Sequence, residues 1–235
     1  MPFDHNDHYH RLLLRKLPPH GRTALDIGCG TGRFARLLAA RGYEVDALDP
    51  APDVIAAARA AGGGPRFRTA DVTEEDLPEG RYDVITCLAS LHHMPFGTVT
   101  RLCAALAPGG ALLVLGCYAG TTWWDLAAAP ANAVARVAVY AGERLRGAHE
   151  PPLAPPVRQP DMTLPRIRAE AARLLPGSGV RQLLFWRYLL TYQRDGSQQD
   201  GAQRGWASAD SNRQRCTARV TRSGGGSGSS GRSAS

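Results

Sequence analysis

Short apolar runs alternate with amphipathic stretches through the first half of the chain. The runs predict five strands: Thr23–Ile27, Val45–Leu48, Arg66–Ala70, Tyr82–Leu88 and Ala111–Cys117. Between them, apolar residues three and four positions apart predict helices after Phe34, over Asp53–Ala61 and from Val99 to Leu106. Pro108, Gly109 and Gly110 should terminate the last of these helices. Strands separated by single helices imply right-handed crossovers, and so an α/β fold with a doubly wound, mainly parallel sheet.

The pattern becomes less regular beyond Cys117. We expect a helix over Trp123–Arg146 and, because it holds five prolines, irregular structure over Glu150–Pro160. Leu164–Leu175 is predicted as an amphipathic helix. Val180–Tyr192 is rich in aliphatic and aromatic residues, which is typical of a strand. That segment fits either one long strand or a tight hairpin.

Composition divides the 235 residues into a domain and a tail. An apolar content of 43% is enough for a core, and the length suits one α/β domain. Residues 195–235 hold eight of the 26 glycines and show no periodicity. We therefore expect a folded domain over residues 1–194 and a disordered, flexible Gly/Ser/Arg-rich tail over residues 195–235.

The basic charge points only weakly to a nucleic-acid partner. The net charge is +7, with 27 Arg and one Lys, and six Arg against three Asp place +3 of it in the tail. The remaining Arg residues are scattered and do not alternate with stacking aromatics, so nucleic acid is not the expected partner. The chain has five cysteines, an odd number, which favours a reducing, cytoplasmic location. No apolar run resembles a signal peptide or a membrane span, so we expect no membrane association.

The most specific motif is the glycine-rich sequence from Asp26 to Gly32, in which Gly28, Gly30 and Gly32 follow the first predicted strand. Glycines permit a positive φ and a close approach of ligand to backbone, and the helix that follows presents free N–H groups. The spacing lacks the third glycine of a dinucleotide fingerprint, since Arg33 stands there, and no phosphate-loop lysine follows. A tight turn without a ligand remains the alternative.

Two further acids follow neighbouring strands. Asp49, before Pro50, ends the second strand, where a carboxylate can accept the two hydroxyls of a ribose. Asp71, before Val72, follows the third strand, where it can accept a bond from an adenine amino group while Val72 offers a backbone N–H. Each acid alone is also explained as a helix-entry or capping residue. Together with the glycines they mark the edge where open α/β sheets bind ligands.

Residues 20–118 resemble the class I S-adenosylmethionine-dependent methyltransferases, which have a Rossmann-like fold. The resemblance rests on Leu25–Gly32, Val45–Asp49, Thr69–Asp71, Tyr82–Leu88 with Leu91–Met94, and Leu106–Gly110. It implies S-adenosylmethionine as the cofactor, with S-adenosylhomocysteine as the product. It also implies cofactor-binding roles for the following residues: Asp26, Gly28, Gly30, Gly32, Asp49, Pro50, Asp71, Val72, and the backbone of Cys87 and Leu88. Tyr9 and His10 match an N-terminal helix that covers the cofactor in related enzymes.

Methyl transfer needs alignment of donor and acceptor, and a hydroxyl acceptor must also lose its proton. His92 and His93 follow the fourth strand, so one of them is the candidate base, although both are also explained as residues that fix the loop. No paired carboxylates follow that strand, and the crowded Asp4–His10 cluster has no partner cluster, so no metal site is expected.

The resemblance places acceptor-binding elements between the fifth and last strands, here residues 119–165. Tyr118, Trp123 and Trp124 would line an apolar pocket there, or simply pack a helix on the sheet. We therefore expect transfer to a small-molecule acceptor, at oxygen. The alternatives are an RNA (tRNA) methyltransferase and a protein that binds S-adenosylmethionine without turning it over.

Overall fold

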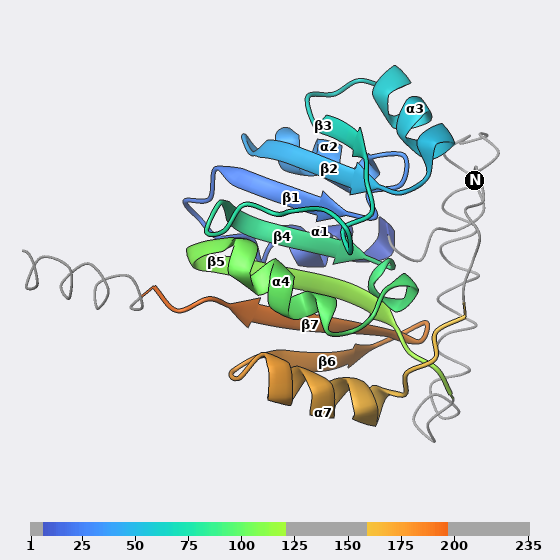
Figure 1. The fold of residues 1–235 in the computed structure, drawn as a ribbon, viewed down its shortest axis with the longest axis vertical. Helices are drawn as coiled ribbons and strands as arrows, with labels where there is room; N and C mark the ends of the chain where they lie inside the picture. Colours follow the sequence, from blue (N-terminus) through green and yellow to red (C-terminus); the bar gives the residue numbers. More distant parts are fainter. Residues whose placement is uncertain (1–6, 121–158, 197–235) are drawn as a thin grey trace, which may run out of the picture. The chain divides into compact units, whose positions relative to one another are not determined.

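The computed structural model describes residues 7–120 and 159–196, which form one seven-stranded sheet between two layers of helices (Figure 1). The strands are β1 (Thr23–Ile27), β2 (Glu44–Asp49), β3 (Arg66–Thr69), β4 (Tyr82–Leu88), β5 (Leu106–Cys117), β6 (Gly179–Leu183) and β7 (Arg187–Gln193). The helices are α1 (Asp7–Leu14), α2 (Arg33–Ala39), α3 (Pro52–Ala60), α4 (Thr98–Ala105) and α7 (Leu164–Leu174), with a single 3-10 turn, η1 (Leu91–His93).

The strand order is β3-β2-β1-β4-β5-β7-β6. Strands β1 to β5 pair in parallel, and β7 runs antiparallel to both β5 and β6. This confirms the predicted α/β fold with a mainly parallel sheet. The short strands β3 and β6 form its two edges, and Val180–Tyr192 is a hairpin with its turn at residues 184–186.

Each face of the sheet has its own core. Leu25, Ile27 and Ile85 pack with α4, α7 and η1, which lie in front of the sheet in Figure 1. Ala24 and Val84 point to the opposite face and pack with α1, α2 and α3. Because both faces are covered, the central strands are largely apolar, which explains why they were readily predicted.

The prediction that Pro108, Gly109 and Gly110 end a helix is wrong. Helix α4 ends at Ala105, and β5 begins at once with Leu106, which pairs with Tyr82. A register shift follows between Tyr82 and Val84. The backbone approaches closely there, since a Cβ on Gly110 would lie 2.8 Å from the carbonyl oxygen of Ala107 and 2.9 Å from that of Tyr82. The glycines thus accommodate an irregular strand instead of stopping a helix.

Several predictions concern residues that the structure does not describe. The expected helix Trp123–Arg146, most of Glu150–Pro160 and residues 197–235 lie outside the described ranges. Among the helices of residues 7–120 and 159–196, none has the length and hydropathy needed to cross a membrane. The same residues contain no group of three or more His, Cys, Asp or Glu side chains arranged to hold a metal ion.

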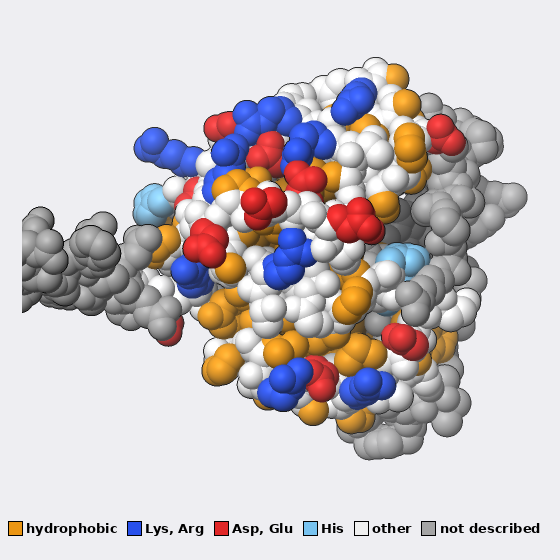
Figure 2. Space-filling model, viewed as in Figure 1, with side chains coloured by type: hydrophobic (Ala, Val, Ile, Leu, Met, Phe, Trp, Pro, Cys, Tyr) orange, Lys and Arg blue, Asp and Glu red, His pale blue; other side chains and the backbone are white. Residues whose placement is uncertain are grey.

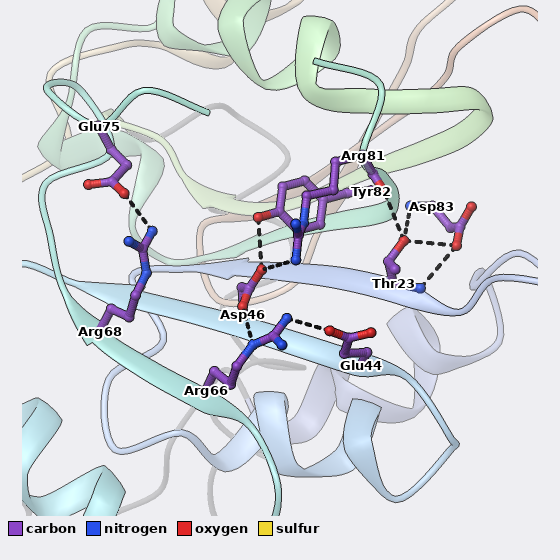
Figure 3. A network of polar contacts seen from close by, with 9 residues as sticks. All are labelled: Thr23, Glu44, Asp46, Arg66, Arg68, Glu75, Arg81, Tyr82 and Asp83. Carbon is purple, nitrogen blue, oxygen red and sulfur yellow. Dashed lines mark hydrogen bonds and ion pairs between the residues drawn. The ribbon is translucent and has the colours of Figure 1, made fainter. Parts of the chain in front are cut away.

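A polar network ties the amino-terminal halves of three strands together (Figure 3). Asp46 of β2 accepts bonds from Arg66 of β3 (2.8 Å) and from the Tyr82 hydroxyl of β4 (2.9 Å). Although partial burial works to raise it, these two bonds hold the pKa of Asp46 below its ordinary value. The ionised carboxylate therefore locks the end of the sheet opposite the glycine-rich turn.

Candidate functional site

The glycine-rich turn closes β1 and opens α2 with a backbone that only glycine adopts without strain. Gly28, Gly30 and Gly32 have φ values of +64°, +55° and +79°. The N–H groups of Gly28 and Cys29 donate to the carbonyl oxygen of Leu48 (2.8 and 3.0 Å), which fixes the turn to the end of β2. A Cβ on Gly30 would meet no atom within 4 Å. The turn is thus a cradle that is open at Gly30, whereas Ser90 and Phe67 crowd Gly28 and Gly32.

Asp49 holds this cradle from the adjacent strand. Its Oδ2 accepts the N–H of Gly30 (3.0 Å), and its Oδ1 accepts the N–H of Ala51 at the start of α3 (3.0 Å). Asp49 therefore does act as a helix-entry residue for α3. A carboxylate offers about four acceptor positions, so capacity remains for ligand hydroxyls. Pro50 follows it and is exposed.

Asp71 and Val72 follow β3 at the same edge. The Oδ1 of Asp71 accepts both the N–H (2.8 Å) and the hydroxyl (2.7 Å) of Thr73, so the capping explanation is also correct. Neither contact involves Oδ2 of Asp71, and Asp71 is exposed. Val72 is buried in the core beneath it. One exposed carboxylate above one buried apolar side chain suits the edge of a flat, amine-bearing ring.

The loop after β4 packs directly on the glycine-rich turn. Ser90 donates to the carbonyl oxygen of Ile27 (2.7 Å) and contacts the Sγ of Cys87 (3.0 Å). A Cβ on Gly28 would lie 2.3 Å from that of Ser90. Ala89 has a φ of +54°, a strained value for a residue other than glycine. The backbone at Leu88 therefore turns sharply beside the cradle.

Ser90 and Ala89 were not predicted from the sequence. A serine and an alanine after a strand carry no signal of their own. Their positions follow from the packing of β4 beside β1, where Ala89 donates its N–H to the carbonyl oxygen of Leu115 (2.7 Å).

Asp26 is a buried carboxyl group beneath the turn, only 2% exposed. Burial, with a smaller contribution from the charge of Asp49, raises its pKa to about 7. The Thr86 hydroxyl opposes this by donating to Asp26 Oδ1 (2.7 Å). A carboxyl group that changes its charge near neutral pH is suited to hold a cationic ligand group. The sequence did not single out Thr86 for this contact.

His92 and His93 lie together in η1, with ring centroids 4.1 Å apart. His93 is exposed, whereas His92 is half-buried and lines a small, largely apolar cavity with Met94, Met162 and Tyr188. The cavity measures only about 20 Å³, so the two histidines are candidate bases because they follow β4 at this edge of the sheet.

Helix α1 bridges the two halves of this edge. Its Tyr9 is buried and donates its hydroxyl to the carbonyl oxygen of Leu184 in the β6–β7 turn (3.1 Å). The ring of His10 lies 5.0 Å from that of Phe34, in the first turn of α2. Tyr118 is buried and accepts a bond from Gln182 (2.9 Å), whereas Trp123 and Trp124 lie outside the described residues.

The residues present fit S-adenosylmethionine. The open backbone at Gly30, the acceptor capacity of Asp49 and the titratable Asp26 suit a ligand that carries hydroxyls and a cationic amino-acid part. Predicted binding residues from β1, β2, β3 and β4 are brought to one edge of the sheet.

Comparisons with known proteins agree on the chemistry. The sequence profile of the methyltransferase domain family matches residues 4–143. An uncharacterised methyltransferase of Mycobacterium tuberculosis strain H37Rv is 32% identical over 207 residues, which cover 82% of this chain and 97% of that protein. A ubiquinone biosynthesis O-methyltransferase of Xanthomonas axonopodis is 34% identical over 131 residues, 52% of this chain and 54% of the relative.

A solved structure of an S-adenosylmethionine-dependent methyltransferase from Mesorhizobium loti shares the fold. The TM-score is 0.52 at 20% identity, over 78% of this chain and 96% of the other. At this identity the likeness shows the fold alone.

Proposed function

This chain belongs to the methyltransferase domain family, and we propose that it moves the methyl group of S-adenosylmethionine to an oxygen atom of a small-molecule acceptor. The observation that carries the proposal is the cradle at Gly30, which is braced by Asp49 and lies above the buried Asp26. When bound, the cofactor supplies an electrophilic methyl group on a positively charged sulfur.

Each anchor has a distinct part in holding the cofactor. The carboxylate of Asp49 accepts the ribose hydroxyls, and Asp71 with Val72 holds the adenine. The ionised form of Asp26, the glycine backbone of Gly28, Gly30 and Gly32, and the backbone at Cys87 and Leu88 surround the amino-acid part. These roles are supported by the positions of the residues at the ends of four adjacent strands.

The reaction then needs alignment and removal of one proton. Alignment of two bound reactants lowers the barrier by roughly 7–11 kcal/mol in favourable cases. An imidazole nitrogen of His92 or His93 would accept the proton of the acceptor hydroxyl while the methyl–sulfur bond breaks and the methyl–oxygen bond forms, with S-adenosylhomocysteine as the product. The position of both histidines directly after β4, at the edge where the cofactor anchors meet, supports this assignment.

Transfer to oxygen of a small molecule is further supported by the O-methyltransferase relative. Basic and acidic side chains are interspersed on the face shown in Figure 2, which does not resemble the continuous basic surface of a nucleic-acid-binding protein. Residues 119–165, with Tyr118, are the segment that we assign to the acceptor, and residues 1–194 to the catalytic domain.

The test measures cofactor binding and methyl transfer separately. Isothermal titration of the full chain should show binding of both S-adenosylmethionine and S-adenosylhomocysteine. Isotopically labelled cofactor is then incubated with fractionated small-molecule extracts and, in parallel, with bulk tRNA. Label in the small-molecule fraction is expected; label only in tRNA would refute the acceptor class, and failure to bind either cofactor form would refute the whole proposal.

The base is tested with His92→Ala and His93→Ala. One of them should lower kcat by about 10²- to 10⁴-fold without changing cofactor affinity, with partial recovery at higher pH. His20→Ala is the matched control, because His20 is exposed and precedes β1, at the opposite edge of the sheet. If both site variants match this control, the histidines are not bases, and the methyltransferase assignment is unaffected.

A further inference from the structure

Arg187, the first residue of β7, carries a positive charge at the ligand-binding edge that the described residues do not satisfy. Its Nη1 donates to the sulfur of Cys117 at the end of β5 (2.6 Å), and its Nε is buried without a hydrogen-bond partner. Within residues 7–120 and 159–196 no ion pair joins it to an acidic side chain. A half-buried guanidinium group with one unpartnered N–H and a thiol as its only described side-chain acceptor is suited to an anionic partner.

Cys117 does not supply that partner. Burial raises the pKa of its thiol, and the nearby charge of Arg187 offsets this only in part. The sulfur is therefore a neutral, weak acceptor at neutral pH. The charge of Arg187 is also felt at Tyr9 of α1, where it works against the effect of burial on the pKa of the phenol.

The turn before Arg187 is strained and apolar. Phe185 and Trp186 have φ values of +60° and +54°, which bulky side chains rarely adopt. Phe185 is buried, whereas Leu184 and Trp186 are the exposed large hydrophobic residues of the described chain, at 39% and 38%. Strain of this kind is typical of sites that bind ligands. Exposed apolar residues in the turn that leads directly into Arg187 suit a molecule with an anionic group on an apolar body.

Arg187 lies away from the cofactor anchors, on the far side of β5. It pairs with Cys117, two residues beyond Leu115, which pairs with Leu88 of β4. Two strand spacings therefore separate β7 from β4, about 10 Å. The proposed cofactor contacts come from β1, β2, β3 and β4, so a group held by Arg187 belongs to the second substrate.

We propose that Arg187 binds a carboxylate of the methyl acceptor, with Leu184 and Trp186 against the apolar part of the same molecule. The planar guanidinium group pairs with a carboxylate through two parallel bonds, which Lys cannot reproduce. Arg187 is thus a specificity-determining residue. This inference rests on the proposed function, since it names the class of acceptor for that same site.

The test uses two small probes that differ only in charge. Binding of 4-fluorobenzoate and 4-fluorobenzamide to the full chain is measured by fluorine NMR, with and without S-adenosylhomocysteine. The carboxylate should bind at least about tenfold more tightly than the amide, as expected for a hydrogen-bonded ion pair. Arg187→Gln should remove this preference, and Arg187→Lys should keep only part of it.

Arg181→Gln is the matched control. Arg181 is exposed on the adjacent strand β6, and its charge also acts on Tyr9, so this variant removes the same charge from the same region. It should retain the full preference. The proposal is overturned if the native chain binds both probes equally, if Arg187→Gln keeps the preference, or if Arg181→Gln loses it equally.

Phenyl phosphate tests whether the anionic group of the acceptor is a phosphate. If it binds more tightly than the benzoate probe, Arg187 is assigned to a phosphate and not to a carboxylate. The binding of S-adenosylhomocysteine separates the two hypotheses. A carboxylate preference in a chain that binds no cofactor would refute the proposed function but not the role of Arg187. Normal cofactor binding without the preference would refute only the role of Arg187.

Discussion

Strands β1 and β2 end in turns held by main-chain hydrogen bonds, whereas the β6–β7 hairpin ends in three bulky residues. In the first region glycines adopt positive φ values and Asp49 braces the backbone from the adjacent strand. In the second, Phe185 and Trp186 adopt positive φ values and keep them because Phe185 is buried and Tyr9 bonds to Leu184. One region avoids strain through residue choice, and the other overcomes it through packing. In our proposal the cofactor lies at the first region and the acceptor at the second.

The largest effect is expected for Gly28→Ala. The new methyl group would meet Ser90 at 2.3 Å in a backbone with φ +64°, so the free energy of unfolding should fall by about 2–5 kcal/mol and cofactor binding should be lost. Urea denaturation and titration with S-adenosylhomocysteine measure both.

Gly42→Ala is the control for this change. Its φ is +87°, but a Cβ there meets nothing within 4 Å, so only the backbone cost of about 1–2 kcal/mol should appear, with cofactor affinity intact. Equal losses in the two variants would mean that contact with Ser90 is unimportant.

The second effect concerns pH. The pKa of Asp26 is raised from 3.8 to about 7, so between these values the folded protein holds a proton that the unfolded chain has released. The stability that it contributes is complete below pH 3.8 and is lost as the pH rises through 7. From about pH 5 to pH 8 the loss is roughly 3 kcal/mol at most. Asp26→Asn should flatten this slope in urea denaturation.

Asp46→Asn is the control for the pH effect, because its pKa is shifted in the opposite direction. Hydrogen bonds lower it, so the stability that Asp46 contributes is present above the unfolded pKa and is lost only in acid. Near neutral pH the slope of this variant should match that of the native chain. A slope that persists in Asp26→Asn would assign the titration to another group.

The smallest effect is expected at the hairpin. Trp186→Gly relieves a φ of +54° while removing a partly exposed side chain, so the free energy of unfolding should change by less than about 1 kcal/mol. Cofactor affinity should stay unchanged, while acceptor turnover falls. Phe185→Gly relieves similar strain but empties a buried position, and should cost about 3–5 kcal/mol. Thermal unfolding measures both variants. Equal losses of stability in Trp186→Gly and Phe185→Gly would contradict the comparison.

The sequence predicted those features that depend on residues close together in the chain. The run Tyr82–Leu88 matches β4 residue for residue, because a strand covered on both faces is mostly apolar and stands out in the sequence. The cradle could be predicted because only glycine suits the backbone at Gly28, Gly30 and Gly32.

The unpredicted features depend on contacts between distant segments. The hairpin turn contains no Gly, Pro, Asn or Asp, so nothing in residues 184–186 indicates a reversal of the chain. Ser90 and Thr86 gain their importance from β1, more than 50 residues earlier, with sequence separations of 63 and 60 residues for their bonds to Ile27 and Asp26. The role that we propose for Arg187 depends in the same way on Cys117.

The two edge strands, β3 and β6, bear on how this protein meets other copies of itself. An exposed edge offers unpaired backbone groups to any other strand. β3 has four residues, two of them exposed arginines, and β6 has five, with Arg181 exposed at its centre. Edges this short offer few backbone bonds, and their charged side chains must stay in contact with water or with their ion-pair partners. The sheet is thereby protected on both sides against strand-by-strand aggregation, and a dimer built by extending the sheet is disfavoured.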